Sequence, residues 1–315
     1  MFAALATPVH GDEPPAEIAA TGPSPGPPLW RVSKGEHELW LFGTLSAVPE
    51  EIRWRSTAVE RAIGDSDEVL LPPGARAALT LNPVTLIRAW RRAREMSRNP
   101  DGKHLAEVLP PDLYGRYAAL RDRYAKHRSL EHLRPIMAAT RVYQAAVEEM
   151  GLTPDRDVLS VIERLARRAG AETTDTQLHV DPDALLDEAA RVSTEAELDC
   201  FTKVLDTIER GENRIGARAR AWASGDLDAL RRFDYPDIRK DCLAFPGWPD
   251  GLRETLRAAN DKWIEAAERA LSINRSTFGA LDLRDLLAPD GLLARLREQG
   301  YQVDEPTSAG GKTPK

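Results

Sequence analysis

Apolar and polar residues alternate near the beginning of the chain. Residues 29–32 (LWRV) and 38–42 (ELWLF) have the short apolar pattern of strands, and the polar residues between them contain a glycine. This pattern predicts a β-hairpin. A second apolar run at residues 67–71, stopped by two prolines, predicts a short buried strand.

The middle of the chain repeats its apolar residues with the period of a helix. From residue 83 to about 149 this period is interrupted at residues 99–102 and 110–111, where Pro and Gly occur. A helix is also expected from Pro49, in the first turn, to about residue 63. Further helices are expected at residues 155–169, 195–208, 214–222, 227–233 and 251–271, and a strand at residues 172–178.

The last part of the chain returns to strand-like patterns. Residues 276–281 predict a strand that runs into a turn, and residues 301–303 predict a final strand. A helix is expected between them, from Pro289 to about residue 299, with Gly300 just after its end. We therefore expect a mixed α+β fold, in which N- and C-terminal strands form a sheet and a large helical region lies between them.

Composition excludes several classes of protein. The 315 residues are 30% charged with a net charge of -7, and the mean hydropathy is −0.43. No apolar run approaches the roughly 18 residues that span a bilayer, so we expect no membrane-spanning segment. An acidic chain is not expected to bind nucleic acid as its main task. Two cysteines are too few for a zinc ribbon or an iron–sulfur cluster.

Residues 1–28 indicate processing and a linker. The sequence Ala4-Leu5-Ala6 matches the A-x-A pattern of a signal-peptidase site, although the basic and most of the apolar region that precede such a site are missing. We interpret residues 1–28 as a signal remnant and a Pro-rich linker of a periplasmic or secreted protein whose start lies upstream. The alternative is an Ala-rich tail. Residues 306–315 are expected to be a disordered tail.

Two five-residue segments resemble each other. Residues 42–46 (FGTLS) and 278–282 (FGALD) each place Phe-Gly-x-Leu and a polar residue at the end of a predicted strand. Ligands often bind outside the carboxyl ends of strands. We therefore expect the two strand ends to face one another at a cleft, although two unrelated strand–turn–helix units would give the same pattern.

These segments carry a family resemblance. Together with residues 29–32, 260–263 (NDKW) and 289–293 (PDGLL), they make the chain similar to the TraB/GumN family, which also contains the Tiki-type metalloproteases. The resemblance spans about residues 29–305 and implies one domain of that fold. GumN-like members are bacterial and usually exported.

The resemblance implies a pair of Gly-x-x-His motifs, whose imidazoles would hold a divalent ion. Here Ser46 and Asp282 stand at the two histidine positions. Pro72 or Pro73 stands where members often carry Glu, and Ala259-Asn260 replaces Arg-Asn. The resemblance thus implies a catalytically degenerate member, a pseudoenzyme without a metal or other cofactor, with Ser46, Asp282 and Asn260 at the former catalytic positions.

We expect such a protein to bind a peptide, a glycan or an envelope protein. The cleft would lie between residues 43–46 and 279–282, with Gly43, Thr44, Gly279 and Asp175 in contact with the ligand. The alternative is a divalent-metal-dependent hydrolase with altered ligands. A Ser46 nucleophile would require a base within hydrogen-bond reach, and none is evident nearby in the sequence.

Cysteines recur in this helical region of GumN-like sequences, and the resemblance implies a disulfide between Cys200 and Cys242. A disulfide suits an exported protein, and two buried free thiols are the alternative. The arginine-rich stretches at residues 88–94, 164–168 and 214–220 are interpreted as solvated helix faces paired with acids. Trp90, Trp222 and Trp263 are expected in the core. No metal role is expected for any single histidine.

Overall fold

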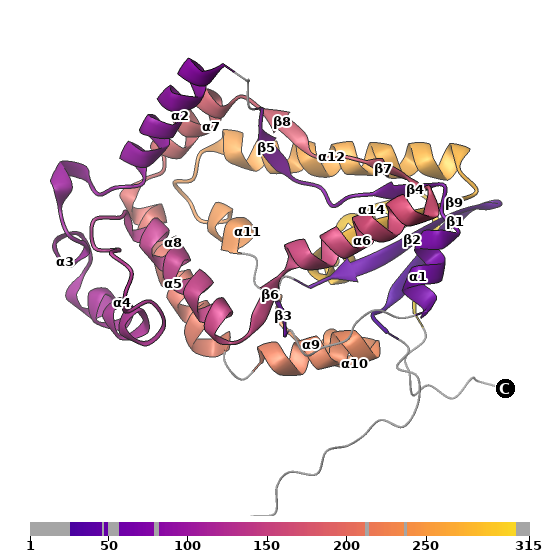
Figure 1. Ribbon diagram of the computed structural model, residues 1–315, viewed down its shortest axis with the longest axis horizontal. Coiled ribbons are helices and arrows are strands. Elements are labelled where there is room, and N and C mark those ends of the chain that lie inside the picture. Colours follow the sequence, from indigo (N-terminus) through magenta and orange to yellow (C-terminus); the bar gives the residue numbers. More distant parts are fainter. Residues whose placement is uncertain are drawn as a thin grey trace, which may run out of the picture.

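The computed structural model describes residues 26–45, 47–49, 57–78, 82–211, 214–235 and 238–306. Its main sheet has six strands in the order β10-β1-β2-β9-β4-β7. These strands are β1 (Leu29–Lys34), β2 (His37–Thr44), β4 (Glu68–Leu70), β7 (Glu172–Thr174), β9 (Ser276–Asp282) and β10 (Gln302–Asp304). The expected mixed fold is confirmed: strands from the two ends of the chain share one sheet, and most of the helices lie between them in sequence (Figure 1).

The predicted hairpin is present. Strands β1 and β2 pair antiparallel, with Val32 opposite Leu39, and Gly35 has a φ of 63° in the turn. A positive φ is readily adopted only by glycine, which explains this residue at the turn. Leu41 and Phe42 at the end of β2 are both fully buried, because β2 lies inside the sheet with strands on both sides.

Strands β2 and β9 are parallel neighbours. Gly43 pairs with Leu281, and Thr44 pairs with Asp282. Strand β9 is also parallel to β4, and β4 to β7. The carboxyl ends of these four strands therefore lie along one edge of the sheet. Residues 42–44 and 280–282 are thus paired neighbours in the sheet, and the expected cleft between the two strand ends stays a prediction.

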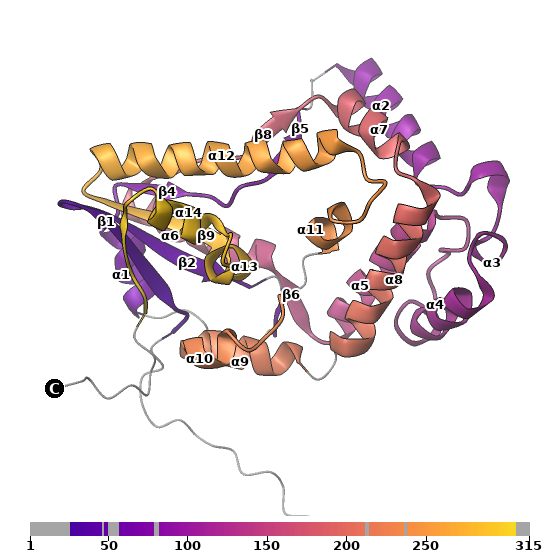
Figure 2. The ribbon, with the colours of Figure 1, turned by 180° about the vertical axis from the view of Figure 1, so that it is seen from behind.

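The helices surround this sheet and extend beyond it. Helix α12 crosses from the sheet to α7, while α4, α5 and α8 form a separate layer at the other end of the molecule (Figures 1 and 2). The helices are α1 (Thr57–Gly64), α2 (Pro83–Met96), η1 (Pro100–Gly102), α3 (Leu105–Val108), α4 (Pro111–Tyr124), α5 (Pro135–Glu149), α6 (Asp155–Ala169), α7 (Pro182–Ala190), α8 (Thr194–Gly211), α9 (Ile215–Ser224), α10 (Leu227–Leu230), α11 (Ile238–Leu243), α12 (Asp250–Ile273), α13 (Leu283–Leu287) and α14 (Leu292–Glu298).

Three predicted element boundaries are wrong. Pro49 does not begin a helix, because it ends strand β3 (Ala47–Pro49), which pairs with β6 (Leu152–Pro154). The expected strand at residues 172–178 is two strands, since the chain turns after β7 and continues as β8 (Leu178–Val180) beside β5 (Ala75–Ala77). Pro289 precedes α14 by three residues. The unpredicted helix α13 begins directly after β9 because the side chain of Asp282 caps it.

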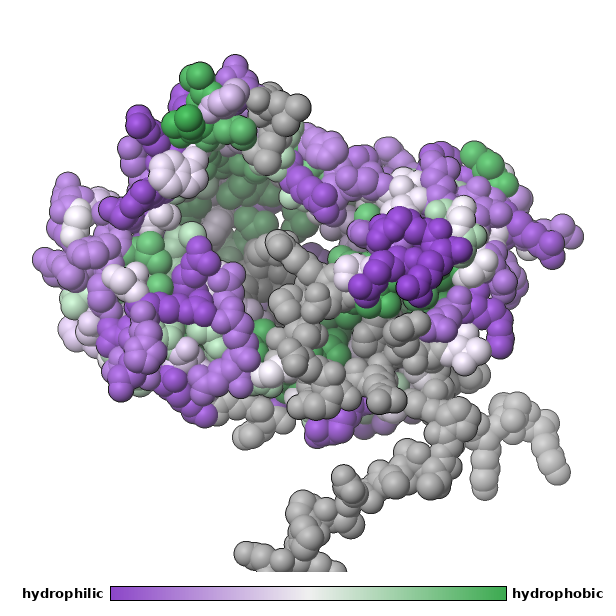
Figure 3. Space-filling view, viewed as in Figure 1, coloured by the Kyte–Doolittle hydropathy of each residue, from purple (hydrophilic) through white to green (hydrophobic). Residues whose placement is uncertain are grey.

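Buried apolar residues form two clusters. The first packs the sheet against helices that include α1, α9, α12 and α14, and it contains Trp222 and Trp263, both fully buried as expected. The second lies within α3, α4, α5 and α8. The expectation for Trp90 is wrong. Its side chain is 59% exposed on α2, a helix with no fully buried residue, and Figure 3 shows apolar surface over that helix.

Cys200 on α8 and Cys242 on α11 form the expected disulfide. Both residues are buried, and the short α11 lies beside α8. No helix in the described part of the chain is long and apolar enough to cross a membrane.

Candidate functional site

One of the two histidine positions of the family motif, Asp282, lies at the carboxyl edge of the sheet beside Thr44. Thr44 is buried, and its hydroxyl donates to the carbonyl of Leu281 at 3.2 Å. The carboxylate of Asp282 accepts from the backbone N–H of Arg284 at 2.8 Å and caps α13. Ser46 lies outside the described residues. Asp282, at one of the positions where the family resemblance implies a catalytic group, therefore has a structural contact, and so does its neighbour Thr44.

The glycines of the two segments allow close packing. A Cβ on Gly43 would lie 2.6 Å from Cδ2 of Leu283, and one on Gly279 would lie 3.0 Å from Cδ2 of Leu41. The carbonyl of Gly43 also accepts a hydrogen bond from the indole of Trp222 at 2.6 Å. The structure thus gives both glycines a packing role, and their contact with a ligand stays a prediction.

Asn260 and Asp175 lie in different surroundings. Asn260 is on α12, and its Oδ1 is buried without a partner among the described residues. Asp175 is exposed just beyond β7 and accepts from the backbone N–H of Gln177 at 2.9 Å. Strand β4 lies between β7 and β9. The end of β7, which Asp175 follows, is therefore about 10 Å from the end of β9 at the usual spacing between strands. Contact of Asn260 and Asp175 with a ligand also stays a prediction.

A cavity of about 470 Å³ is lined by several helices, among them α13, which follows β9, and α9, which contacts the end of β2. Helix α13 begins directly after Asp282 and contributes Arg284 to the wall. Helix α9 contributes Arg218, one turn before the Trp222 that contacts Gly43. The remaining wall residues come mainly from α5, α8 and the segment after α10. The cavity is therefore connected to both strand ends through α9 and α13, although Gly43 and Asp282 do not themselves line it.

The wall of the cavity carries more cationic than acidic side chains. The cations are Lys203, Arg210, Arg214, Arg218, Arg231 and Arg284, and the acids are Asp206, Asp234 and Asp241. Most of these cations are paired with carboxylates: Arg210 with Asp206, Arg214 with Asp234, Arg231 with Glu305, and both Lys203 and Arg284 with Asp241.

Arg218 differs from the other cations of the wall. It is 8% exposed, its Nη1 donates to the backbone carbonyl of Asp234 at 2.8 Å, and its Nε is buried without a partner in the described part of the chain. The guanidinium lies over the ring of Tyr235, 5.6 Å from the centroid. Burial lowers the pKa of Arg218, against the opposing effect of nearby groups that include Tyr143, Tyr235 and Asp282. Burial raises the pKa of the Tyr235 hydroxyl, because it disfavours the charged form of this group as well.

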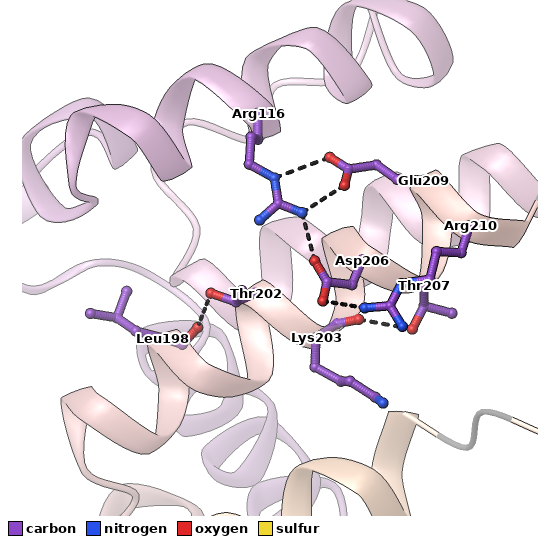
Figure 4. A network of polar contacts seen from close by, with 8 residues as sticks. All are labelled: Arg116, Leu198, Thr202, Lys203, Asp206, Thr207, Glu209 and Arg210. Carbon is purple, nitrogen blue, oxygen red and sulfur yellow. Dashed lines mark hydrogen bonds and ion pairs between the residues drawn. The ribbon is translucent and has the colours of Figure 1, made fainter.

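A network of ion pairs holds α8 beside the cavity. Arg116 on α4 donates to both Asp206 and Glu209, and Arg210 also donates to Asp206 (Figure 4). Burial is the largest single influence on the pKa of Asp206 and raises it, but the hydrogen bonds and charges of the two arginines together lower that pKa. The network fixes Asp206 at the cavity wall and joins α4 to α8.

The sequence interpretation of residues 214–220 missed Arg218. That stretch was expected to be a solvated face, whereas Arg218 is buried and Arg220 is exposed. One pattern in the sequence does predict that Arg218 is buried. Arg218 precedes Trp222 by four residues, and residues four apart share a face of a helix. An arginine that shares a face with a buried tryptophan should itself be buried.

The described residues do not fit the metal that the family resemblance implies. Within the described ranges there is no group of three or more His, Cys, Asp or Glu side chains that could hold an ion. His104 and His132 do come together, with ring centroids 4.2 Å apart, but a protein site for zinc has at least three protein ligands. We therefore derive no chemistry that involves a metal.

Comparison with known proteins identifies one family. The sequence model of the TraB/PrgY/gumN family matches residues 28–305. No curated protein and no solved structure matches the chain.

Proposed function

Because the chain belongs to the TraB/PrgY/gumN family, and because its strand ends lead into a cavity, we propose that it is a non-catalytic member that binds a peptide segment. The cavity between α5, α8, α9 and α13 is the binding site. The observation that carries this proposal is that the carboxylate of Asp282 caps α13, while later residues of this helix and residues of α9 form part of the wall of an open cavity.

The wall of the cavity favours a peptide over a glycan. Carbohydrate sites commonly use the open face of an aromatic ring; of the three rings in the wall, Tyr143, Phe233 and Tyr235, that of Tyr235 has the guanidinium of Arg218 over one face. Cationic, acidic and apolar side chains occur close together in the wall, which suits the mixed side chains of a peptide better than a run of hydroxyls. An envelope protein could supply such a peptide as an exposed segment.

An exported location accords with this proposal. The disulfide between Cys200 and Cys242 is the kind of bond that persists in an oxidising compartment. We place the protein in the periplasm or outside the cell, where peptide segments of envelope proteins are accessible.

Metal-dependent hydrolysis is the competing function. The carboxylate of Asp282 already caps α13, and the donor set of the described residues does not favour a metal. Metal analysis of the purified protein, followed by incubation with unstructured peptides, separates the two functions. A stoichiometric divalent ion together with peptide cleavage would overturn the binding proposal.

Peptide binding is tested by filling the cavity. The substitution Ala288→Trp places a large ring in the wall, while Ala184→Trp adds the same ring to an exposed position on α7 that does not line the cavity. Peptides are selected from a random library on the wild-type protein, and their affinities for all three proteins are measured by fluorescence anisotropy. We expect Ala288→Trp to weaken binding at least tenfold and Ala184→Trp to leave it unchanged. Equal affinities for the three proteins would refute the site.

A further inference from the structure

We propose that Arg218 forms an oxyanion subsite in this cavity, and that the bound ligand presents a carboxylate or phosphate group to it. This inference rests on the proposed function, since it assigns a chemical class to part of the same ligand. It concerns Arg218, which forms no salt bridge with a carboxylate in the part of the chain that the structure describes and lies in a stretch whose sequence predicts a solvated face.

The guanidinium of Arg218 has unused donors. Arginine carries five N–H groups. Among the described residues, one acceptor, the backbone carbonyl of Asp234, is within hydrogen-bond distance of this guanidinium, and Nε has none. A carboxylate or phosphate can accept two parallel hydrogen bonds from one guanidinium. An oxyanion in the cavity would therefore supply the acceptors that the protein wall lacks.

The neighbouring acids have other contacts. Asp282 acts electrostatically on Arg218, and its carboxylate also caps α13, accepting from the backbone N–H of Arg284 at 2.8 Å. The carboxylate of Asp234 is 91% exposed and lies 3.5 Å from Arg214, and the hydrogen bond from Arg218 goes to the backbone carbonyl of this residue. Asp241 is held by Arg284 at 2.7 Å. Removing a guanidinium from water without a carboxylate partner is unfavourable for folding. Such a residue is expected where a ligand completes the pairing.

The surrounding charge supports the same ligand class. Arg214 and Arg231 line the same cavity, and their side chains are 65% and 46% exposed. These two arginines are paired with Asp234 and Glu305, so the support lies in the excess of cations over acids in the wall as a whole, which favours a negatively charged ligand.

The test uses two small probes and matched variants. Inorganic phosphate and N-acetyl-aspartate are titrated calorimetrically into the wild-type protein, Arg218→Met and Arg220→Met, with sodium chloride holding the ionic strength constant. Arg220 is exposed on the same helix and does not line the cavity, so its variant controls for the loss of one charge. The two probes separate a phosphate-bearing ligand from a carboxylate-bearing one.

We expect at least one probe to bind the wild-type protein and Arg220→Met alike, and at least tenfold more weakly to Arg218→Met. Arg218→Lys retains the charge without the paired donors and should show intermediate affinity. Without a probe, Arg218→Met should unfold at the wild-type temperature or above it, because methionine removes the buried charge at a similar volume.

Two results would overturn the subsite: neither probe binds the wild-type protein, or Arg218→Met binds the probes as tightly as the wild type does. If peptide binding is still lost in Ala288→Trp, the proposed function stands and only the oxyanion subsite fails. If the probes depend on Arg218 but no peptide binding depends on the cavity, the subsite stands and the peptide proposal fails.

Discussion

Loss of the disulfide between Cys200 and Cys242 should destabilise the protein strongly. The perturbation is the double substitution to alanine, or reduction of the wild-type protein. The two cysteines are separated by 42 positions in the sequence. In the chain-entropy model a loop of this length raises the free energy of unfolding by about 4 kcal/mol at 25 °C. That is a large share of the roughly 5–15 kcal/mol that stabilises a typical domain.

The structure also predicts where the effect is felt. Helix α11 (Ile238–Leu243) has only six residues, which is too short to be stable alone. It is held to α8 by the disulfide and by the pair between Lys203 and Asp241, whose Nζ and Oδ2 atoms lie 3.8 Å apart. Because Asp241 lines the cavity, a loosened α11 should also weaken ligand binding.

Urea unfolding followed by far-UV circular dichroism measures the loss. We expect the double alanine variant and the reduced wild type to lose similar free energies of unfolding, each about 4 kcal/mol. Reductant should not change the free energy of unfolding of the double alanine variant. This control shows that the reductant acts on the wild type only through the disulfide. A loss below about 1 kcal/mol with an unchanged slope against urea would show that the cross-link does not restrict the unfolded chain as argued.

Three further predictions concern single side chains. Trp222→Phe removes the indole donor to the carbonyl of Gly43 and should cost about 1–2 kcal/mol in urea unfolding; an unchanged midpoint would contradict this. Trp90→Ala, at an exposed position, should change the free energy of unfolding by less than about 0.5 kcal/mol. Trp263→Ala, at a buried position, should lower it by about 3–5 kcal/mol. Similar losses in the two variants would contradict the difference in burial between the two tryptophans. Asp206→Asn should flatten the acid limb of a plot of stability against pH. The pKa of Asp206 is lowered by folding, so its contribution is complete above the unfolded value of about 3.9 and is lost as the pH falls through the lowered value. An acid limb as steep as that of the wild type would contradict the ion-pair network.

The sequence predicted those parts of the fold that depend on local patterns and on the repeated segment. The hairpin around Gly35 follows from alternation and a turn residue. The neighbouring positions of Thr44 and Asp282 follow from two similar strand ends. The boundary at Pro49 failed because proline is accepted both at a helix start and in a short edge strand. Nothing local distinguishes these two environments.

The cavity was not predicted from the sequence: the expected cleft lies between residues 43–46 and 279–282, whose described residues do not line the cavity. Packing decides which groups face the cavity, and packing depends on distant residues. Leu283 lies against Gly43, and Trp222 hydrogen-bonds to the same glycine from a helix far along the chain. A count of charges could not identify Arg218 among the arginines of its stretch, because their exposure depends on how α9 is oriented against the sheet.

The pairing of β2 with β9 also constrains how the protein is made. Most of the family-matched region lies between these two central strands. During synthesis the N-terminal hairpin emerges early, but its apolar inner strand stays without a partner until β9 has been translated. Contacts between such distant segments form slowly, and unpaired strands of incompletely folded chains are prone to aggregation. Nascent or truncated chains that end before β9 should therefore require a chaperone that covers β2.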